Sequence, residues 1–86
     1  MYIILVYDIN EARVAKMLKL CRQYLHWIQN SVFEGEITEV KLQELIYKCR
    51  AMMKESDSVI IFKSREQKWL EKQVIGMEKN QISPFL

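Results

Sequence analysis

The sequence predicts an α+β fold in which two helices cover one face of an antiparallel sheet. This is the split βαβ arrangement, a ferredoxin-like βαββαβ-type sandwich. Short apolar runs near the start of the chain and in its second half are typical of buried strands. Longer segments between these runs repeat apolar residues at helical spacing. With 86 residues, the chain is expected to form a single domain, residues 1–86.

The first predicted strand lies within Tyr2–Asn10, where an apolar run from Tyr2 to Tyr7 leads directly into Asp8. A strand buried on both faces fixes the backbone, so an acid at its end lies where water, a metal ion or a phosphate can reach it. The local pattern by itself favours the other interpretation, in which Asp8 ends the strand or caps the helix that follows. The local pattern leaves both interpretations open.

Both predicted helices begin at a capping residue and carry one apolar face. Asn10 precedes the first helix and Thr38 the second, and each is followed by a glutamate that favours a helix N-terminus. The apolar faces consist of Val14, Met17, Leu18, Cys21 and Leu25 in the first helix, and of Leu42, Leu45, Ile46, Cys49 and Met52 or Met53 in the second.

Three further strands complete the predicted sheet. The segment His26–Ile37 alternates with period two and is interpreted as one strand, and Val59–Phe62 is fully apolar. Trp69–Gly76 alternates weakly, which favours an edge strand, with a short helical turn as the alternative. Right-handed crossovers are expected to place the strands from Tyr2 and Val59 side by side at the centre of the sheet.

The apolar content predicts a homodimer. Half of the residues are hydrophobic, which is more than the surface of so small a domain hides easily, and the sheet face without helices needs a cover. The terminal Ile82, Phe85 and Leu86 are expected either to fold onto their own subunit or to add a strand to the sheet edge of a neighbouring subunit.

The cysteines and the hydropathy indicate a cytoplasmic protein without a membrane partner. Cys21 and Cys49 occupy apolar helix positions, which is typical of buried free thiols in a reducing cytosol. No apolar run approaches the roughly 18 residues that a membrane span needs. The stretch Tyr2–Tyr7 is too short for a signal peptide and has no basic residue before it.

The charge pattern permits a phosphate-binding face. The net charge of +2 is small, but basic residues gather in residues 1–30 and 61–86, and acids gather between Glu34 and Asp57. The polar side of the first helix is basic or neutral and is either a solvated face or a surface that follows a phosphate backbone. Its charged residues are Arg13, Lys16, Lys19 and Arg22.

The residues support metal-assisted chemistry better than nucleophilic catalysis. The sequence has no glycine-rich phosphate loop, no CxxC or HExxH motif, and only one histidine. Mg²⁺, or Mn²⁺ in its place, can be held by one or two carboxylates with waters and phosphate oxygens. A two-fold dimer would supply two copies of Asp8 across its axis. Attack of water on a phosphodiester is then the expected use of the site.

Several stretches together resemble one family along the whole chain, from Met1 to Leu86. These are VYDI, YLHWIQNSVFEGEI, SVIIF, and KQVIGMEKN followed by ISPFL, of which QNSVFEGE is the most specific. The sequence resembles the small CRISPR-associated adaptation proteins, the Cas-two family. The resemblance implies a ferredoxin-like homodimer whose C-terminal strand joins the sheet of the partner subunit.

The resemblance also implies an activity and partners. It implies a role in spacer acquisition for CRISPR antiviral defence, in which the dimer bridges two dimers of the CRISPR integrase and spans the protospacer duplex. It further implies a metal-dependent endonuclease that acts on single-stranded RNA or double-stranded DNA. Two alternatives stay open: a stand-alone, toxin-like enzyme that cleaves RNA, and a scaffold without catalysis. The small number of carboxylates favours the scaffold as the biological role.

The resemblance assigns roles to individual residues. The metal-binding, catalytic aspartate at the end of the first strand falls on Asp8, which both subunits are expected to contribute. The first-helix arginine falls on Arg13, although many members have two adjacent basic residues where this chain has Ala12 and Arg13. The residues expected to bind nucleic acid are Tyr7, Arg13, Lys16, Arg22, Ser31 and Phe33.

Overall fold

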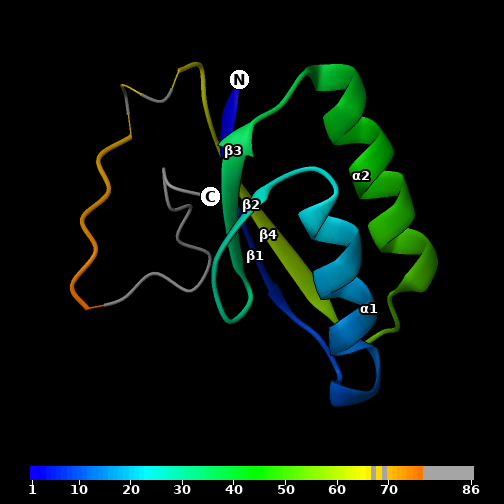
Figure 1. The fold of residues 1–86 in the computed structure, drawn as a ribbon. Helices are drawn as coiled ribbons and strands as arrows, with labels where there is room; N and C mark the ends of the chain where they lie inside the picture. Colours follow the sequence, from blue (N-terminus) through cyan, green and yellow to red (C-terminus); the bar gives the residue numbers. More distant parts are fainter. Residues whose placement is uncertain (67, 69, 77–86) are drawn as a thin grey trace.

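The computed structural model describes residues 1–66, 68 and 70–76, and it confirms the ferredoxin-like α+β fold. The elements in this part of the chain are β1 (Tyr2–Asp8), α1 (Glu11–Arg22), β2 (His26–Gln29), β3 (Val32–Glu36), α2 (Glu39–Met52) and β4 (Ser58–Ser64). The strands form an antiparallel sheet in the order β2-β3-β1-β4. Both helices pack on the same face of this sheet, as Figure 1 shows.

The segment His26–Ile37, predicted as one strand, is a hairpin of β2 and β3. Its chain reverses at Asn30, whose φ of 42° lies in the left-handed region. Asparagine adopts this conformation more readily than other residues with a Cβ. The indole N–H of Trp27 donates a 2.8 Å hydrogen bond to the carbonyl of Asn30 and closes the turn. The single-strand prediction was wrong because the alternation continues on both sides of the turn.

The predicted edge strand Trp69–Gly76 is absent from residues 70–76, and Trp69 and the tail from residue 77 lie outside the described residues. The fourth strand comes instead from the hairpin. The strands from Tyr2 and Val59 are neighbours as predicted, with Tyr7 opposite Val59. In the described sheet, however, β4 lies at an edge, and β3 and β1 form the centre.

The core lies between the sheet and the two helices. Alternate residues of β1, namely Ile3, Leu5 and Tyr7, point toward the helices together with Phe33 of β3. Burying each such side chain contributes about 1.5–3 kcal/mol to stability. The predicted helix stripes face this layer except at Val14, which is exposed near the start of α1. The buried residues that the helices contribute are Met17, Cys21, Leu42, Leu45 and Cys49. Both cysteines are buried free thiols, as predicted.

Both helix caps form as the sequence predicts. The side chain of Asn10 accepts a 2.9 Å hydrogen bond from the backbone N–H of Ala12. The hydroxyl of Thr38 accepts one of 3.1 Å from the N–H of Lys41. Because these bonds satisfy backbone donors that a helix leaves without partners, they determine where α1 and α2 begin.

The sheet face opposite the helices remains partly apolar and exposed. Ile4 and Val6 of β1 lie on this open face, opposite Phe62 and Ile60 of β4. Phe62 is 57% and Ile60 53% exposed. Residues 72–75 lie on the same side of the sheet and line a hollow of about 240 Å³ together with Ile4, Ile28, Gln29 and Val32.

Candidate functional site

Asp8 ends β1 on the rim of the open face. Strand alternation places its side chain on the same face as Ile4 and Val6, and its partner across the sheet is Ser58 of β4. The carboxylate is exposed, and within residues 1–66, 68 and 70–76 it makes no hydrogen bond or ion pair. In this fold Asp8 does not cap α1, because Asn10 has that role. The carboxylate is therefore free to bind a ligand.

Ser31 lies beside this strand end because of the hairpin. The backbone N–H of Tyr7 donates a 3.1 Å hydrogen bond to the carbonyl of Ser31, which directly follows the turn at Asn30. The end of β1 therefore lies between the hairpin turn and Ser58 of β4. This arrangement places two serines near Asp8, and hydroxyl oxygens can donate to or accept from a phosphate or water.

Tyr7 and Phe33 pack in the core. Their rings stack with centroids 5.9 Å apart at an angle of 28°. Phe33 is fully buried, and Tyr7 is buried as well. Burial raises the pKa of the Tyr7 hydroxyl above its ordinary value of 10.0. In this structure the two rings hold β1 against β3, and they offer no exposed surface on which a base could stack.

The guanidinium group of Arg13 is bound to Asp57. Its Nε and Nη2 donate to Oδ2 of Asp57 at 2.9 and 2.7 Å. The same carboxylate accepts from the backbone N–H groups of Asn10 and Lys54, each at 2.9 Å. These hydrogen bonds, the backbone ones first and then that from Arg13, lower the pKa of Asp57 below its ordinary value of 3.8. Arg13 therefore joins the start of α1 to the segment before β4.

Asp57 is the residue at this end of the sheet that the sequence did not single out. The side chain of Asp57 is completely buried, whereas 21% of the Arg13 side chain is exposed. An acid directly before an apolar strand is a weak signal for such a role. Its partner Arg13 lies 44 residues away, so only the tertiary contact identifies the pair.

Lys16 and Arg22 lie apart from Asp8 on α1. Lys16 is exposed and lines a groove between α1 and α2. Arg22 is near the other end of the helix, where its guanidinium carbon lies 5.7 Å from the ring centre of Trp27. The helical rise separates Arg13 from Arg22 by about 13 Å along the axis. Of the residues predicted to bind nucleic acid, Tyr7, Ser31 and Arg13 lie at the end of the sheet that holds Asp8, and the side chain of Tyr7 is buried there.

A metal ion would need ligands beyond one subunit. No group of three or more histidine, cysteine, aspartate or glutamate side chains suited to a metal occurs among the described residues. Asp57 is not available, since Arg13 and two backbone N–H groups occupy its oxygens. Asp8 offers one exposed carboxylate that has no partner among the described residues. That donor fits an ion such as Mg²⁺, which keeps several waters and takes one or two carboxylates.

Neither helix in the described part of the chain is long and apolar enough to cross a membrane.

A family model described as "CRISPR associated protein Cas2" matches residues 1–72. Among curated proteins, the chain is 49% identical to the CRISPR-associated endoribonuclease Cas2 of Dictyoglomus turgidum, with all of both chains covered. It is 42% identical to the protein of that name from Fusobacterium nucleatum, covering all of this chain and 87% of that one.

Solved structures give the same result. A crystal structure of Cas2 superposes with a TM-score of 0.86 at 41% identity, covering 96% of this chain and 94% of that chain. Cas2 of Streptococcus pyogenes, crystallised at pH 6.5, superposes with a TM-score of 0.71 at 25% identity, covering 86% of this chain and all of that one. The family model, the curated relatives and the shared fold agree, and the chain therefore belongs to the Cas2 family of CRISPR-associated proteins.

Proposed function

We propose that this chain is a homodimeric, metal-dependent phosphodiester endonuclease of the CRISPR system. The observation that carries the proposal is the exposed carboxylate of Asp8, which has no partner in residues 1–66, 68 and 70–76 and lies at the rim of an apolar sheet face. The relatives from Dictyoglomus turgidum and Fusobacterium nucleatum are both named endoribonucleases. Single-stranded RNA is therefore the first substrate to test, and double-stranded DNA the second.

The proposed dimer forms through the open face. Ile60 and Phe62 are more than half exposed in the single chain, and a second copy would bury them. Because a two-fold axis places the same surface on both sides, the Asp8 residues at its rim would approach each other. A strand from the C-terminal tail that joins the partner's sheet belongs to this proposal as well.

In the dimer, the two Asp8 carboxylates would hold the Mg²⁺ or Mn²⁺ ion. The bound ion would supply an activated water and neutralise charge that develops on the phosphate. Ser31 and Ser58 would contact the phosphodiester from either side of β1. Arg22 would hold the nucleic-acid backbone farther along α1, where its contacts carry no sequence information.

The biological role that we propose is spacer acquisition in the cytoplasm. There the dimer would bridge two integrase dimers and hold the protospacer duplex, while the integrase carries out the chemistry. The single carboxylate per subunit supports this role, because a dedicated nuclease usually offers its metal more ligands. A stand-alone RNA-cleaving enzyme is the second candidate, and the endoribonuclease names of the relatives favour it.

Replacing Asp8 tests the proposal. We expect Asp8→Ala to abolish Mg²⁺-dependent cleavage of single-stranded RNA and duplex DNA by the purified dimer. Glu11→Ala is the matched control, since Glu11 is also acidic, exposed and close in sequence. Circular dichroism and sedimentation would establish that both variants fold and dimerise. Cleavage that survives in Asp8→Ala would refute the catalytic assignment.

The same variant separates the enzyme from the scaffold in cells. We expect Asp8→Ala to leave integrase binding and spacer acquisition largely intact, because the scaffold role uses surfaces and not the metal. Acquisition would be measured by sequencing new spacers. Loss of acquisition while the variant is folded and dimeric would overturn the scaffold role.

A further inference from the structure

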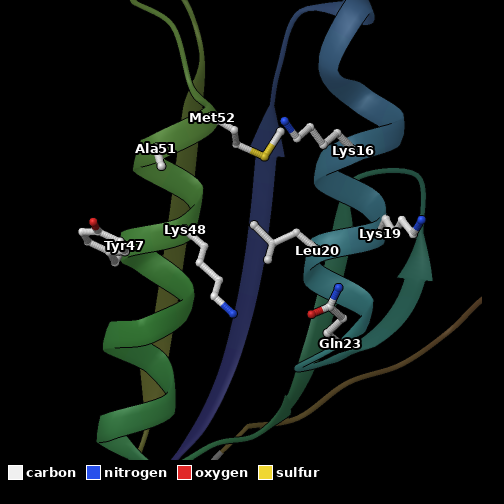
Figure 2. Close-up of a pocket in the computed structure, with 8 residues that line it drawn as sticks. All are labelled: Lys16, Lys19, Leu20, Gln23, Tyr47, Lys48, Ala51 and Met52. Atoms are coloured by element: carbon white, nitrogen blue, oxygen red, sulfur yellow. The ribbon is translucent and has the colours of Figure 1, made fainter.

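The helical layer carries a groove that the Asp8 site does not use. The α1–α2 groove has a volume of about 360 Å³ and is lined by Lys16, Lys19, Leu20, Gln23, Tyr47, Lys48, Ala51 and Met52. Figure 2 shows it between the two helices, with β1 behind it. It opens on the opposite side of the sheet from the open face, so a dimer formed through that face would leave it accessible.

The groove is apolar at its floor and basic around it. Leu20 and Met52 point into the gap between the helices, and Ala51 lies beside them on α2. Lys16 and Lys48 extend across the same gap from opposite helices, whereas Lys19 points away on the outer side of α1. No carboxylate belongs to the lining. The charges are therefore spread along the groove and do not converge on a point that one phosphate could fill.

The lysines of the groove differ in their partners within the described part of the chain. Among the described residues, Lys16 and Lys19 make no ion pair. Lys48 is held by Tyr24, whose hydroxyl accepts a 2.9 Å hydrogen bond from its ammonium group. The Lys48 Nζ also lies 5.4 Å from the Tyr24 ring centre. The same hydroxyl donates a 2.8 Å hydrogen bond to Glu44, so Lys48 is held in place near a carboxylate that lies outside the groove lining.

A stripe of exposed apolar residues runs along α2 next to the groove. Val40, Tyr47 and Ala51 are spaced i, i+7 and i+11 and therefore share one helix face. Val40 is 78% and Tyr47 76% exposed. Large apolar side chains exposed on one face of a helix favour a protein partner, because a nucleic-acid backbone gains little by covering them.

We propose that the α1–α2 groove binds an amphipathic helix of a partner protein that carries aspartate and glutamate beside an apolar stripe. Its apolar side chains would contact Leu20, Ala51 and Met52, and its carboxylates would pair with Lys16 and Lys48, which extend across the gap. A helix is the fitting occupant because a third helix packs into the groove between two others at a distance of about 8–10 Å. This proposal does not depend on the Asp8 site.

Two labelled peptides test the proposal on the full-length protein. One is a helical peptide with leucine at i, i+3, i+4 and i+7 and glutamate on both flanks, and the other has lysine for every glutamate. We expect the glutamate peptide to bind and the lysine peptide to bind at least about tenfold more weakly, measured by fluorescence anisotropy. Equal binding of both peptides, or none, would overturn the proposal.

Three variants locate the site. We expect Lys48→Glu to weaken binding of the glutamate peptide by about tenfold, because the substitution reverses a charge in the groove. Lys63→Glu is the matched control, since Lys63 is exposed on β4 and does not line the groove. Ala51→Gln should also weaken binding of the glutamate peptide, because it replaces an apolar side chain of the groove lining with a polar one and leaves the charge unchanged. Circular dichroism would confirm that each variant is folded.

The remaining measurements distinguish the other occupants. Methyl resonances of ¹³C-labelled methionine should shift at Met52 on peptide binding and stay constant at the buried Met17. Two results together would show that a nucleic acid occupies the groove and that the proposal fails. Ala51→Gln would leave peptide binding unchanged, and Lys48→Glu would weaken the binding of a labelled DNA duplex. A change of oligomeric state in Lys48→Glu would assign the groove to a second copy of this chain and also refute it.

Discussion

Asp57 connects three parts of the chain through one buried carboxylate. Its oxygens accept from Arg13 on α1 and from the backbone of Asn10 and Lys54. Asp8 has the opposite environment, since it is exposed and without a partner in the described part of the chain. Burial and hydrogen bonding give Asp57 a structural role, whereas Asp8 has the exposed carboxylate that our proposed function requires.

We expect Asp57→Asn to lower the unfolding temperature at neutral pH, because a neutral amide cannot form the ion pair with Arg13 and has one acceptor oxygen where the carboxylate has two. The pKa of Asp57 is lowered by folding, so its ionised form stabilises the protein above the ordinary value of 3.8. That stabilisation is lost as the pH falls through the lowered pKa. The difference between wild type and variant should therefore shrink below pH 3.8 in thermal denaturation.

Glu55→Gln is the control for this experiment, because Glu55 is exposed in the same loop and also loses one carboxylate. It should unfold like the wild type at every pH. A stability difference for Asp57→Asn that is constant from neutral to acidic pH would contradict the role of the ionised carboxylate.

At the scale of the elements, the β2–β3 hairpin brings Ser31 to the end of β1. The turn depends on Asn30 in the left-handed conformation and on the bond from the Trp27 indole. Gly35 on β3 lets the α1–β2 connection approach, since a Cβ there would lie 3.3 Å from Cδ2 and 3.7 Å from Cα of Leu25. A tight turn and a missing side chain thus set the position of the hairpin.

Asn30→Val should destabilise the protein by about 1–2 kcal/mol, because a β-branched residue is strained at a φ of 42°. Asn30→Gly should lower the free energy of unfolding much less, since glycine has no Cβ to clash. Chemical denaturation of both variants measures the difference. Equal stability of the valine and glycine variants would show that the backbone conformation at residue 30 does not limit the hairpin.

At the scale of the whole molecule, the sheet has two unlike faces. The helices cover one face, and the other leaves Ile60 and Phe62 more than half exposed. The helical layer also exposes Val40 and Tyr47. One chain thus presents a sheet face for the proposed second copy and a helical face for the proposed partner helix.

We expect Phe62→Asp to raise the dissociation constant of the dimer by at least about a hundredfold. Each dimer would lose two buried phenylalanines, each worth at least about 1.5 kcal/mol. Sedimentation equilibrium measures the change. Val40→Asp is the control, because it introduces the same charge at an exposed apolar residue of the helical layer. Dissociation in both variants, or in neither, would place the dimer interface elsewhere.

The sequence alone predicted the features that depend on neighbouring residues. The caps at Asn10 and Thr38, the helix stripes and the apolar strands follow from spacings that backbone geometry imposes. These features suffice for the fold class and for Asp8 at the end of the first strand. The predictions from residue spacing were wrong in two segments. At His26–Ile37 the residues alternate on both sides of the turn, so the hairpin was predicted as one strand, and at Trp69–Gly76 residues 70–76 form no strand.

Tertiary structure decided which side chains meet. Only the fold pairs Arg13 with Asp57, buries Tyr7 against Phe33, and brings the thiol of Cys49 to within 3.7 Å of the sulfur of Met17. These residues are far apart in the chain, and no local pattern encodes their contacts. The exposure of Asp8 is such a property too, because it depends on what every other element leaves uncovered.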